Sequence, residues 1–265
     1  MPALRALKLR NMRLPGAGAS ELFRVSSAED APQLRALTIL MADLTPAAAH
    51  ALAASGWRLE ELDLSFNSNL GAAGFVALAA APSFTLRRLI LSGCGMDADA
   101  LLSVANAPWP LEELVISSQA LGAAGPELAA LSRHAGLRLL DVRMCHLSAA
   151  GFKALVEAAW PALTYFDASG AGVAFDGPDT LGAAAFFGLP GLEQLHLSYM
   201  RLGATGAALV ASGHWPRLKK LHLVHAQIDD AGVAALARGA WPALEVLNLW
   251  SNGLSAPPTL EDARR

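Results

Sequence analysis

The most constraining feature of this sequence is a short leucine pattern that recurs along nearly its whole length. The pattern is Leu-x-x-Leu-x-Leu, with another apolar residue at its second or third leucine in some copies, and successive copies start 25 to 30 residues apart. A fixed period of this size is typical of a solenoid, in which each unit buries its apolar face only by stacking on its neighbours. The copies begin at Leu4, Leu34, Leu59, Leu86, Leu111, Leu137, Leu163, Leu192, Leu218 and Leu244.

Residues 218–244 show what one repeat contains. Leucines alternate with polar residues at its start, as in a short strand with one buried face. Asp229 then provides a candidate helix N-cap, and Gly232 allows the helix to approach its neighbour closely. Equivalent capping candidates in other repeats are Thr45, Asp97 and Ser148.

A strand, a turn, a helix and a return within one repeat require parallel strands on one side and helices on the other. A helix is ~10 Å wide and strands are ~4.8 Å apart, so the stack should curve with its strands inside. The predicted fold class is therefore α/β: a right-handed horseshoe solenoid of about ten repeats, with a parallel β-sheet on the concave side and helices on the convex side. We expect a single domain over residues 1–265.

Two stretches resemble leucine-rich repeats of the ribonuclease-inhibitor subtype. They are LEELDLSFN at 59–67, which is followed by LGAAGFVAL at 70–78, and LHLVHAQIDDAGVAAL at 221–236. The resemblance implies the solenoid fold and a protein-interaction module, but it names no partner, because members of this family bind unrelated proteins.

That family has Asn or Cys directly after the strand, where its side chain pairs with the loop backbone. Here only Asn67, Cys94, Cys145 and Asn252 match. The other repeats need another partner for the loop backbone or a looser turn. Their residues at this position are Met12, Ala42, Gln119, Ala171, Met200 and Ala226.

Composition argues against nucleic-acid and membrane partners. The net charge is only −3, without a run of like charges, so no basic footprint for nucleic acid is evident. No stretch of about 20 residues is uniformly apolar, as a membrane helix would require. Cys94 and Cys145 occupy strands two apart in the expected sheet, ~9–10 Å from each other and too far for a disulfide. Reduced thiols fit a cytoplasmic, or alternatively a nuclear, location.

The ends of the sequence lack an evident polar cap. Residues 1–4 align with residues 241–244 inside a repeat, and Pro257 and Pro258 interrupt the eleventh helix as it begins. Terminal repeats normally need a polar outer face. We therefore expect the chain to be part of a longer repeat array.

The second position of the strand pattern alternates in charge from Arg35 to Arg138. Neighbouring parallel strands bring these groups together, so opposite charges should pair laterally. Each exposed pair contributes only ~0–1 kcal/mol, and the ladder is interpreted as structural.

The candidate binding residues lie in repeats seven to ten. Both tyrosines and three of the seven histidines fall on exposed strand positions there, and Trp250 is the one tryptophan on the strand face instead of the return corner. Amphipathic aromatics on an accessible surface are typical of binding hot spots. The alternative is local packing beneath a neighbouring repeat or beneath a missing C-terminal cap. The predicted partner-binding residues are Tyr165, His196, Tyr199, His222, His225 and Trp250.

The sequence predicts no catalytic residues, no metal site and no cofactor. Walker, Gly-x-Ser-x-Gly, His-Glu-x-x-His and Cys-x-x-Cys motifs are absent. Asp141, Asp167, His196 and His222 share the fifth position of consecutive strands, which suggests a metal. Strands ~4.8 Å apart would hold the outer members of this column too far from one ion, so we reject that interpretation.

These observations favour a non-catalytic scaffold that binds a protein partner through its concave face. One alternative is a regulatory component that resembles Ran GTPase-activating proteins or F-box receptors, which share this type of repeat. Another is the sensor domain of an innate-immune-type receptor. The identity of the partner, the biological process and the oligomeric state stay open.

Overall fold

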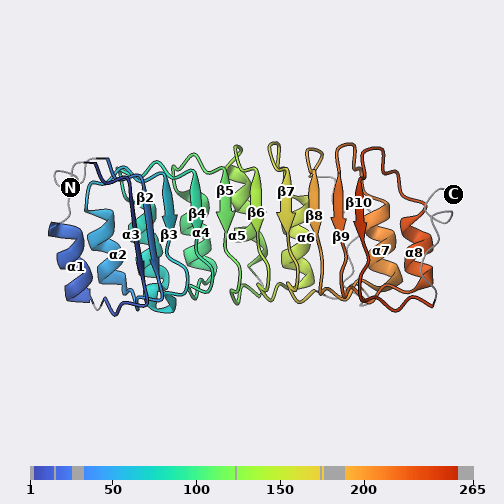
Figure 1. Ribbon diagram of the computed structural model, residues 1–265, viewed down its shortest axis with the longest axis horizontal. Helices are drawn as coiled ribbons and strands as arrows, with labels where there is room; N and C mark the ends of the chain where they lie inside the picture. Colours follow the sequence, from blue (N-terminus) through green and yellow to red (C-terminus); the bar gives the residue numbers. More distant parts are fainter. Residues whose placement is uncertain are drawn as a thin grey trace. The chain divides into compact units, whose positions relative to one another are not determined.

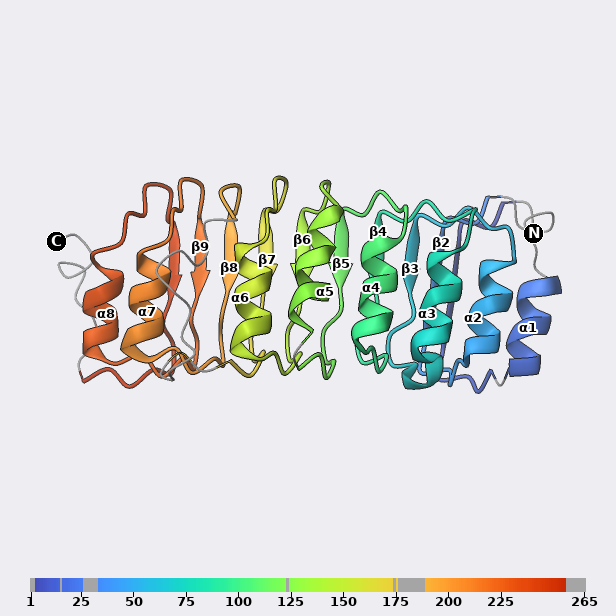
Figure 2. The same ribbon diagram turned by 180° about the vertical axis from the view of Figure 1, so that it is seen from behind.

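The computed structural model describes residues 3–14, 16–25, 33–122, 124–173, 175 and 189–255. Two compact units, Met1–Leu121 and Gly122–Arg265, make up the chain. Both units repeat the same strand, turn and helix, with the strands in one layer and the helices in another (Figures 1 and 2).

The first unit pairs its strands in parallel and in sequence order. These strands are β1 (Ala6–Arg10), β2 (Ala36–Leu40), β3 (Glu61–Asp63), β4 (Arg88–Ile90) and β5 (Glu113–Val115). The helices that back them are α1 (Gly16–Val25), α2 (Pro46–Ala53), the 3₁₀ turn η1 (Ser68–Leu70), α3 (Gly71–Ala79) and α4 (Ala98–Asn106). Figure 2 shows these helices side by side in front of the strands.

The second unit has the same parallel order. Its strands are β6 (Leu139–Asp141), β7 (Tyr165–Asp167), β8 (Gln194–His196), β9 (Lys220–His222) and β10 (Val246–Asn248). Its helices are α5 (Gly125–Ala130), the 3₁₀ turn η2 (Leu131–Arg133), α6 (Ala149–Glu157), α7 (Gly203–Ala211) and α8 (Asp230–Leu236). We call the strand side that the helices leave uncovered the open face.

The predicted α/β solenoid of parallel strands backed by helices is confirmed. The core lies between the two layers, where pattern leucines such as Leu62 and Leu221 are almost fully buried. The four predicted N-caps are also confirmed, because each side chain accepts a hydrogen bond from a backbone N–H in the first turn of its helix. The capping residues are Thr45, Asp97, Ser148 and Asp229. Pro257 and Pro258 lie outside the described residues.

Gly232 brings α8 against α7, as the sequence predicted. A Cβ atom on Gly232 would lie 3.4 Å from the Cβ of Ala207 and 3.5 Å from the Cα of Ala204. The same atom would overlap the side chain of Ile228 at 2.7 Å. The small residue is therefore a packing requirement of the helix layer.

Buried side-chain amides form hydrogen bonds with the backbone N–H and carbonyl groups of the loops that follow the strands. Asn67 Oδ1 accepts the backbone N–H groups of Ala42 and Leu44 at 3.0 and 3.2 Å. Its Nδ2 donates to carbonyls of Ile39 and Leu64 at 2.8 and 2.7 Å. These bonds join each loop to the preceding repeat.

Two kinds of group replace this asparagine where the sequence departs from the family pattern. Gln119 does the same work, because its Oε1 accepts the backbone N–H of Met96 at 3.0 Å and its Nε2 donates to a carbonyl at 2.5 Å. In other repeats a backbone carbonyl takes over: the carbonyl of Ala226 accepts the N–H of Leu202 at 3.0 Å. The predicted need for another partner of the loop backbone is confirmed at Gln119 and Ala226.

Charged side chains pair laterally on the open face, as predicted. In the first unit Arg35 lies 3.5 Å from Glu60, and Arg87 pairs with Glu112. In the second unit Lys219 pairs with Glu193 at 2.8 Å.

The tryptophans at the return corner before each strand pack into the core: Trp57, Trp109, Trp160 and Trp215 are buried, and Trp241 is partly buried. The indole N–H groups of Trp160, Trp215 and Trp241 donate to carbonyls of the preceding helix at 2.7–2.8 Å. Cys94 and Cys145 are buried free thiols. Burial raises the pKa of Cys94 to about 12. Within the described ranges, no helix has the length and apolarity needed to cross a membrane.

A left-handed residue follows the strand in all ten described repeats. Its φ lies between 50° and 62° at Phe66, Gly93 and His225. This conformation turns the chain away from the strand and leaves long side chains at this position exposed, as for Phe66 and Tyr199. The residues are Asn11, Met41, Phe66, Gly93, Ser118, Met144, Gly170, Tyr199, His225 and Ser251.

Candidate functional site

A column of polar residues crosses the second unit. The strand register aligns the fifth position of each repeat, so that every member has the next as its partner across the sheet. Side chains at equivalent positions of parallel neighbours point the same way, here onto the open face. The column consists of Asp141, Asp167, His196, His222 and Asn248.

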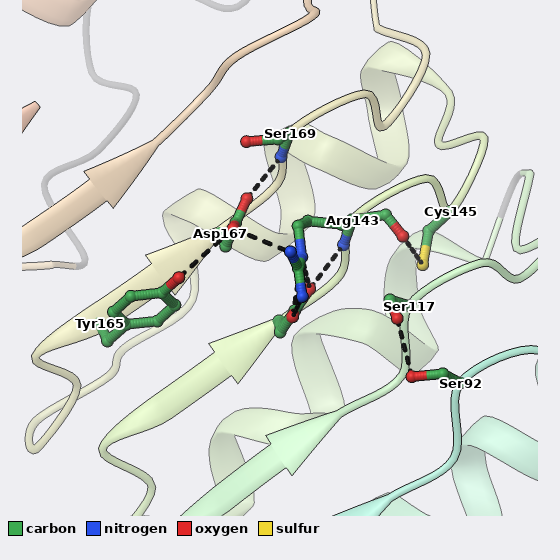
Figure 3. Close-up of polar contacts among 8 residues, drawn as sticks. Ser92, Ser117, Arg143, Cys145, Tyr165, Asp167 and Ser169 are labelled. Carbon is green, nitrogen blue, oxygen red and sulfur yellow. Dashed lines mark hydrogen bonds and ion pairs between the residues drawn. The ribbon is translucent and has the colours of Figure 1, made fainter. Parts of the chain in front are cut away.

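The column begins with two buried carboxylates held by one arginine. Arg143 Nε donates to Asp141 Oδ1 and Oδ2 at 3.0 and 2.9 Å, and it lies 3.4 Å from Asp167 Oδ2 (Figure 3). The aspartates are 4% and 3% exposed. The hydrogen bond that Arg143 donates to Asp141 is the main cause of the raised pKa of Arg143, and burial partly opposes this shift. This pairing stabilises two charges that could not be buried alone.

Tyr165 joins the carboxylates to the histidines. Its phenol donates to Asp167 Oδ2 at 3.3 Å (Figure 3), and its ring lies 5.0 Å from that of His196, centroid to centroid. Burial, followed by the negative charges of Asp167 and Asp141, raises the pKa of Tyr165 to about 12. The phenol therefore stays protonated and remains a donor at neutral pH.

His196 and His222 form the centre of the column. Their ring centroids are 4.4 Å apart and their planes differ by 9°. His196 Nε2 is buried and has no hydrogen-bond partner among the described residues. Burial lowers the pKa of His196, assisted by His222, Arg143 and Lys220 and opposed by Asp167. On the other side, His222 Nδ1 lies 3.5 Å from Asn248 Nδ2.

The more exposed aromatics lie beside this column. Tyr199 stacks on His225 with ring centroids 5.2 Å apart, and Tyr199 is 64% exposed. Trp250 is 78% exposed. The carbonyl of Trp250 accepts the backbone N–H of His225 at 3.0 Å, and its own N–H donates to Asn248 Oδ1 at 3.1 Å. The backbone is thus held firmly while the indole extends into solvent.

The structure sorts the six predicted residues into two sets. Tyr165, His196 and His222 form a half-buried stack, which we call the inner stack. Tyr199, His225 and Trp250 are exposed, and we call them the outer aromatics. Tyr199 is 64% exposed and therefore does not pack beneath a neighbouring described repeat, which was one of the two alternatives for this cluster.

Sequence reasoning did not single out two residues that complete the site, Lys220 and Asn248. Asn248 is the fifth member of the column, and its position in the repeat could have revealed it. Lys220 precedes His222 by two residues and therefore shares its strand face. Among the described residues, no group of three or more His, Cys, Asp or Glu side chains is arranged to hold a metal.

Comparisons with known proteins agree on the repeat. A family model described as "Leucine Rich repeat" matches residues 59–79 and 216–237. Among solved structures, the chain is similar to TLR13 from its complex with ssRNA13, with 22% identity and a TM-score of 0.61 over 96% of this chain and 33% of that one.

It is also similar to an internalin (inlF) of Listeria monocytogenes, with 14% identity and a TM-score of 0.53 over 86% of this chain and 65% of that one. The chain thus spans about a third of the TLR13 chain and just under two thirds of the internalin. No curated protein sequence matches the chain. At these identities the likeness concerns the fold.

Proposed function

Because the chain is a leucine-rich-repeat protein, we propose that it is a non-catalytic scaffold that binds a protein partner through the open face of β7–β10. The inner stack and the outer aromatics are the proposed contact residues. Repeats of this kind offer one extended surface to which several strands contribute side chains, which suits recognition of another protein.

The exposure of Tyr199 and Trp250 carries this proposal. Large amphipathic rings cost free energy when they stand in water, and each can bury ~150–250 Å² at an interface. Here 64% of Tyr199 and 78% of Trp250 are accessible. Their backbones are already ordered by hydrogen bonds to neighbouring repeats, so binding would cost little additional backbone entropy.

We favour a protein over a nucleic acid as the partner. TLR13 was crystallised with a single-stranded RNA, but this chain has a net charge of −3. Several cations on its open face are already paired with carboxylates. A regulatory role, as in GTPase-activating or F-box proteins, and a sensor role are compatible with the same surface.

Three finer assignments belong to the same proposal. The repeats are of the ribonuclease-inhibitor-like subtype, which their period of 25 to 30 residues supports. Residues 1–265 form one domain, which the recurrence of the same strand, turn and helix in both units supports. The location is cytoplasmic, or nuclear, as two buried free thiols suggest.

The test compares three immobilised proteins in quantitative affinity capture from lysate: the natural chain, Tyr199→Ala/Trp250→Ala, and Val76→Ala/Leu102→Ala. The last variant removes exposed apolar side chains from helices α3 and α4 and serves as the matched control. We expect proteins retained by the natural chain and by the control to be lost from the open-face variant. Equal retention by all three would contradict the proposed surface.

A further inference from the structure

We propose that the partner presents an acidic side chain to the open face, and that Lys220 and the His196–His222 stack bind its carboxylate while the outer aromatics contact an adjacent apolar residue. This inference rests on the proposed function and specifies the chemistry of the partner. It follows from which polar atoms of the site are accessible and which are already used.

The acceptor atoms of the site are occupied and hidden. Asp141 and Asp167 are at most 4% exposed, and they accept hydrogen bonds from Arg143, from Tyr165 and from the backbone N–H of Ser169. Asn248 Oδ1 accepts the backbone N–H of Trp250. A donor group on a partner therefore finds few free acceptors here.

Two further acids lie near the beginning of the strands. Glu193 pairs with Lys219 at 2.8 Å, and Glu245 also acts electrostatically on Lys219. Glu193 is thus paired with a cation other than Lys220, and Glu245 interacts electrostatically with that same cation.

The available groups of the site are donors. Among the described residues, no carboxylate pairs with Lys220, although the adjacent Lys219 does have such a partner. Lys220 and His222 share one face of β9, ~7 Å apart along the strand. Lys220 is close enough to the stack to lower the pKa of His196. A carboxylate placed over this part of β9 would pair with Lys220 and accept from an imidazole N–H.

The groups around the histidines determine how binding should depend on pH. On one side His196 faces Tyr165 and Asp167 of β7 and, further away, Arg143 in the loop after β6. On the other side it faces Lys220 and His222 of β9. Only Asp167 favours its protonated form. A bound carboxylate would add a second negative charge and favour imidazolium, so binding should take up a proton and become tighter as the pH falls.

The arrangement suits a single carboxylate better than a nucleic-acid backbone. A polyanion needs a row of cations at the spacing of successive phosphates. Among the described residues, two cations lower the pKa of His196, namely Arg143 and Lys220. Arg143 is paired with Asp141 and Asp167, so Lys220 is the one without a carboxylate partner. One cation beside the stacked imidazole rings matches a single carboxylate.

The experiment uses 3-phenylpropionate as a probe, because it carries one carboxylate and one ring. The full chain is titrated at about pH 5.5 and about pH 7.5, and the imidazole resonances are followed by NMR. His196→Gln and His222→Gln spectra assign the signals.

Neutral 3-phenylpropionamide and cationic phenethylamine are titrated in parallel, and an oligouridylate is added in a separate arm. The Lys220→Ala variant is compared with Lys153→Ala on α6, which removes the same charge from the helix layer.

We expect saturable shifts of the His196 and His222 signals with 3-phenylpropionate alone, and at least about threefold tighter binding at the lower pH. Binding should be lost in Lys220→Ala and kept in Lys153→Ala, with both spectra showing a folded protein. Equal response to the amide or the amine, no response, binding that ignores Lys220, or tighter binding of oligouridylate at the same residues would each overturn the inference. If the probe fails while Tyr199→Ala/Trp250→Ala still loses its captured proteins, the carboxylate chemistry is wrong but the binding surface is retained.

Discussion

His196 and His222 stack almost parallel across β8 and β9, with ring centroids 4.4 Å apart. Such contact is favourable when the rings are neutral and unfavourable when both carry a proton, because like charges this close repel. Burial already lowers the pKa of His196, and the charges of its cationic neighbours add to this effect. The stacking of these two rings therefore favours the neutral form of His196.

The free energy of unfolding of the chain should fall as the pH drops below the ordinary histidine pKa of ~6.5. The pKa of His196 is lower in the folded chain, so the unfolded chain binds more protons below that value and unfolding becomes easier. The contribution is fully present above ~6.5 and is lost as the pH falls through the folded pKa. Denaturant unfolding at several pH values should show a smaller pH dependence in His196→Gln. The exposed His214→Gln serves as the control, and an unchanged slope in His196→Gln would contradict the prediction.

Replacing Arg143 should lower the free energy of unfolding, because two buried carboxylates lose the cation that they share. In Arg143→Met, Asp141 and Asp167 lose their shared cation while they remain at most 4% exposed. We expect a loss of about 2 kcal/mol in unfolding free energy, less than for a fully buried pair because the guanidinium is half exposed. Adding Asp167→Asn should recover part of that loss in denaturant titrations. A double variant less stable than Arg143→Met would argue against charge imbalance as the cause.

Asn67 should be among the most sensitive polar positions of the first unit. Replacement by Ala leaves two N–H groups and two carbonyls without their partner, and Asn67 is 1% exposed. We expect a loss of about 3 kcal/mol, measured by chemical denaturation. Asn69→Ala removes a solvent-exposed bond to Asp43 and should cost less than about 0.5 kcal/mol. Similar losses in both variants would show that burial is not the deciding factor.

Gly93 makes room for the ring of Phe66. Its φ is 62°, and a Cβ atom there would lie 2.9 Å from Phe66 Cδ1. Gly93→Ala should cost about 1 kcal/mol for the left-handed backbone and an additional amount for displacing the ring. In a Phe66→Ala background only the backbone cost should remain. A double-mutant cycle of unfolding free energies tests this coupling, and strict additivity would mean that ring and glycine are independent.

Local interactions were the most predictable from sequence. The caps Asp97 and Asp229 bond to the third residue that follows them, so a short stretch of sequence contains both partners. Where the sequence departs from the family pattern, it predicted that the loop backbone needs another hydrogen-bond partner, but it did not predict which group that would be. That Gln119 would bond to Met96, or that the Ala226 carbonyl would replace a side chain, depends on how two loops lie in space.

The candidate site was partly predictable for the same reason. The fixed period places His196 and His222 at one position of neighbouring strands, so their adjacency follows from counting residues. The period does not specify rotamers, and it therefore could not indicate that the two rings stack, that Tyr165 donates to Asp167, or that Arg143 holds both aspartates.

The sequence by itself determined the solenoid of parallel strands and helices, because a 25 to 30 residue period of leucines can bury its apolar face only by stacking repeat on repeat. Only the tertiary structure decided which polar groups remain available on the open face. The carboxylates of Asp141 and Asp167 are buried and paired with Arg143, whereas Tyr199 and Trp250 are exposed and no described carboxylate pairs with the half-buried Lys220. That outcome depends on side-chain packing across neighbouring strands, where distance and burial, and not residue type alone, set the chemistry.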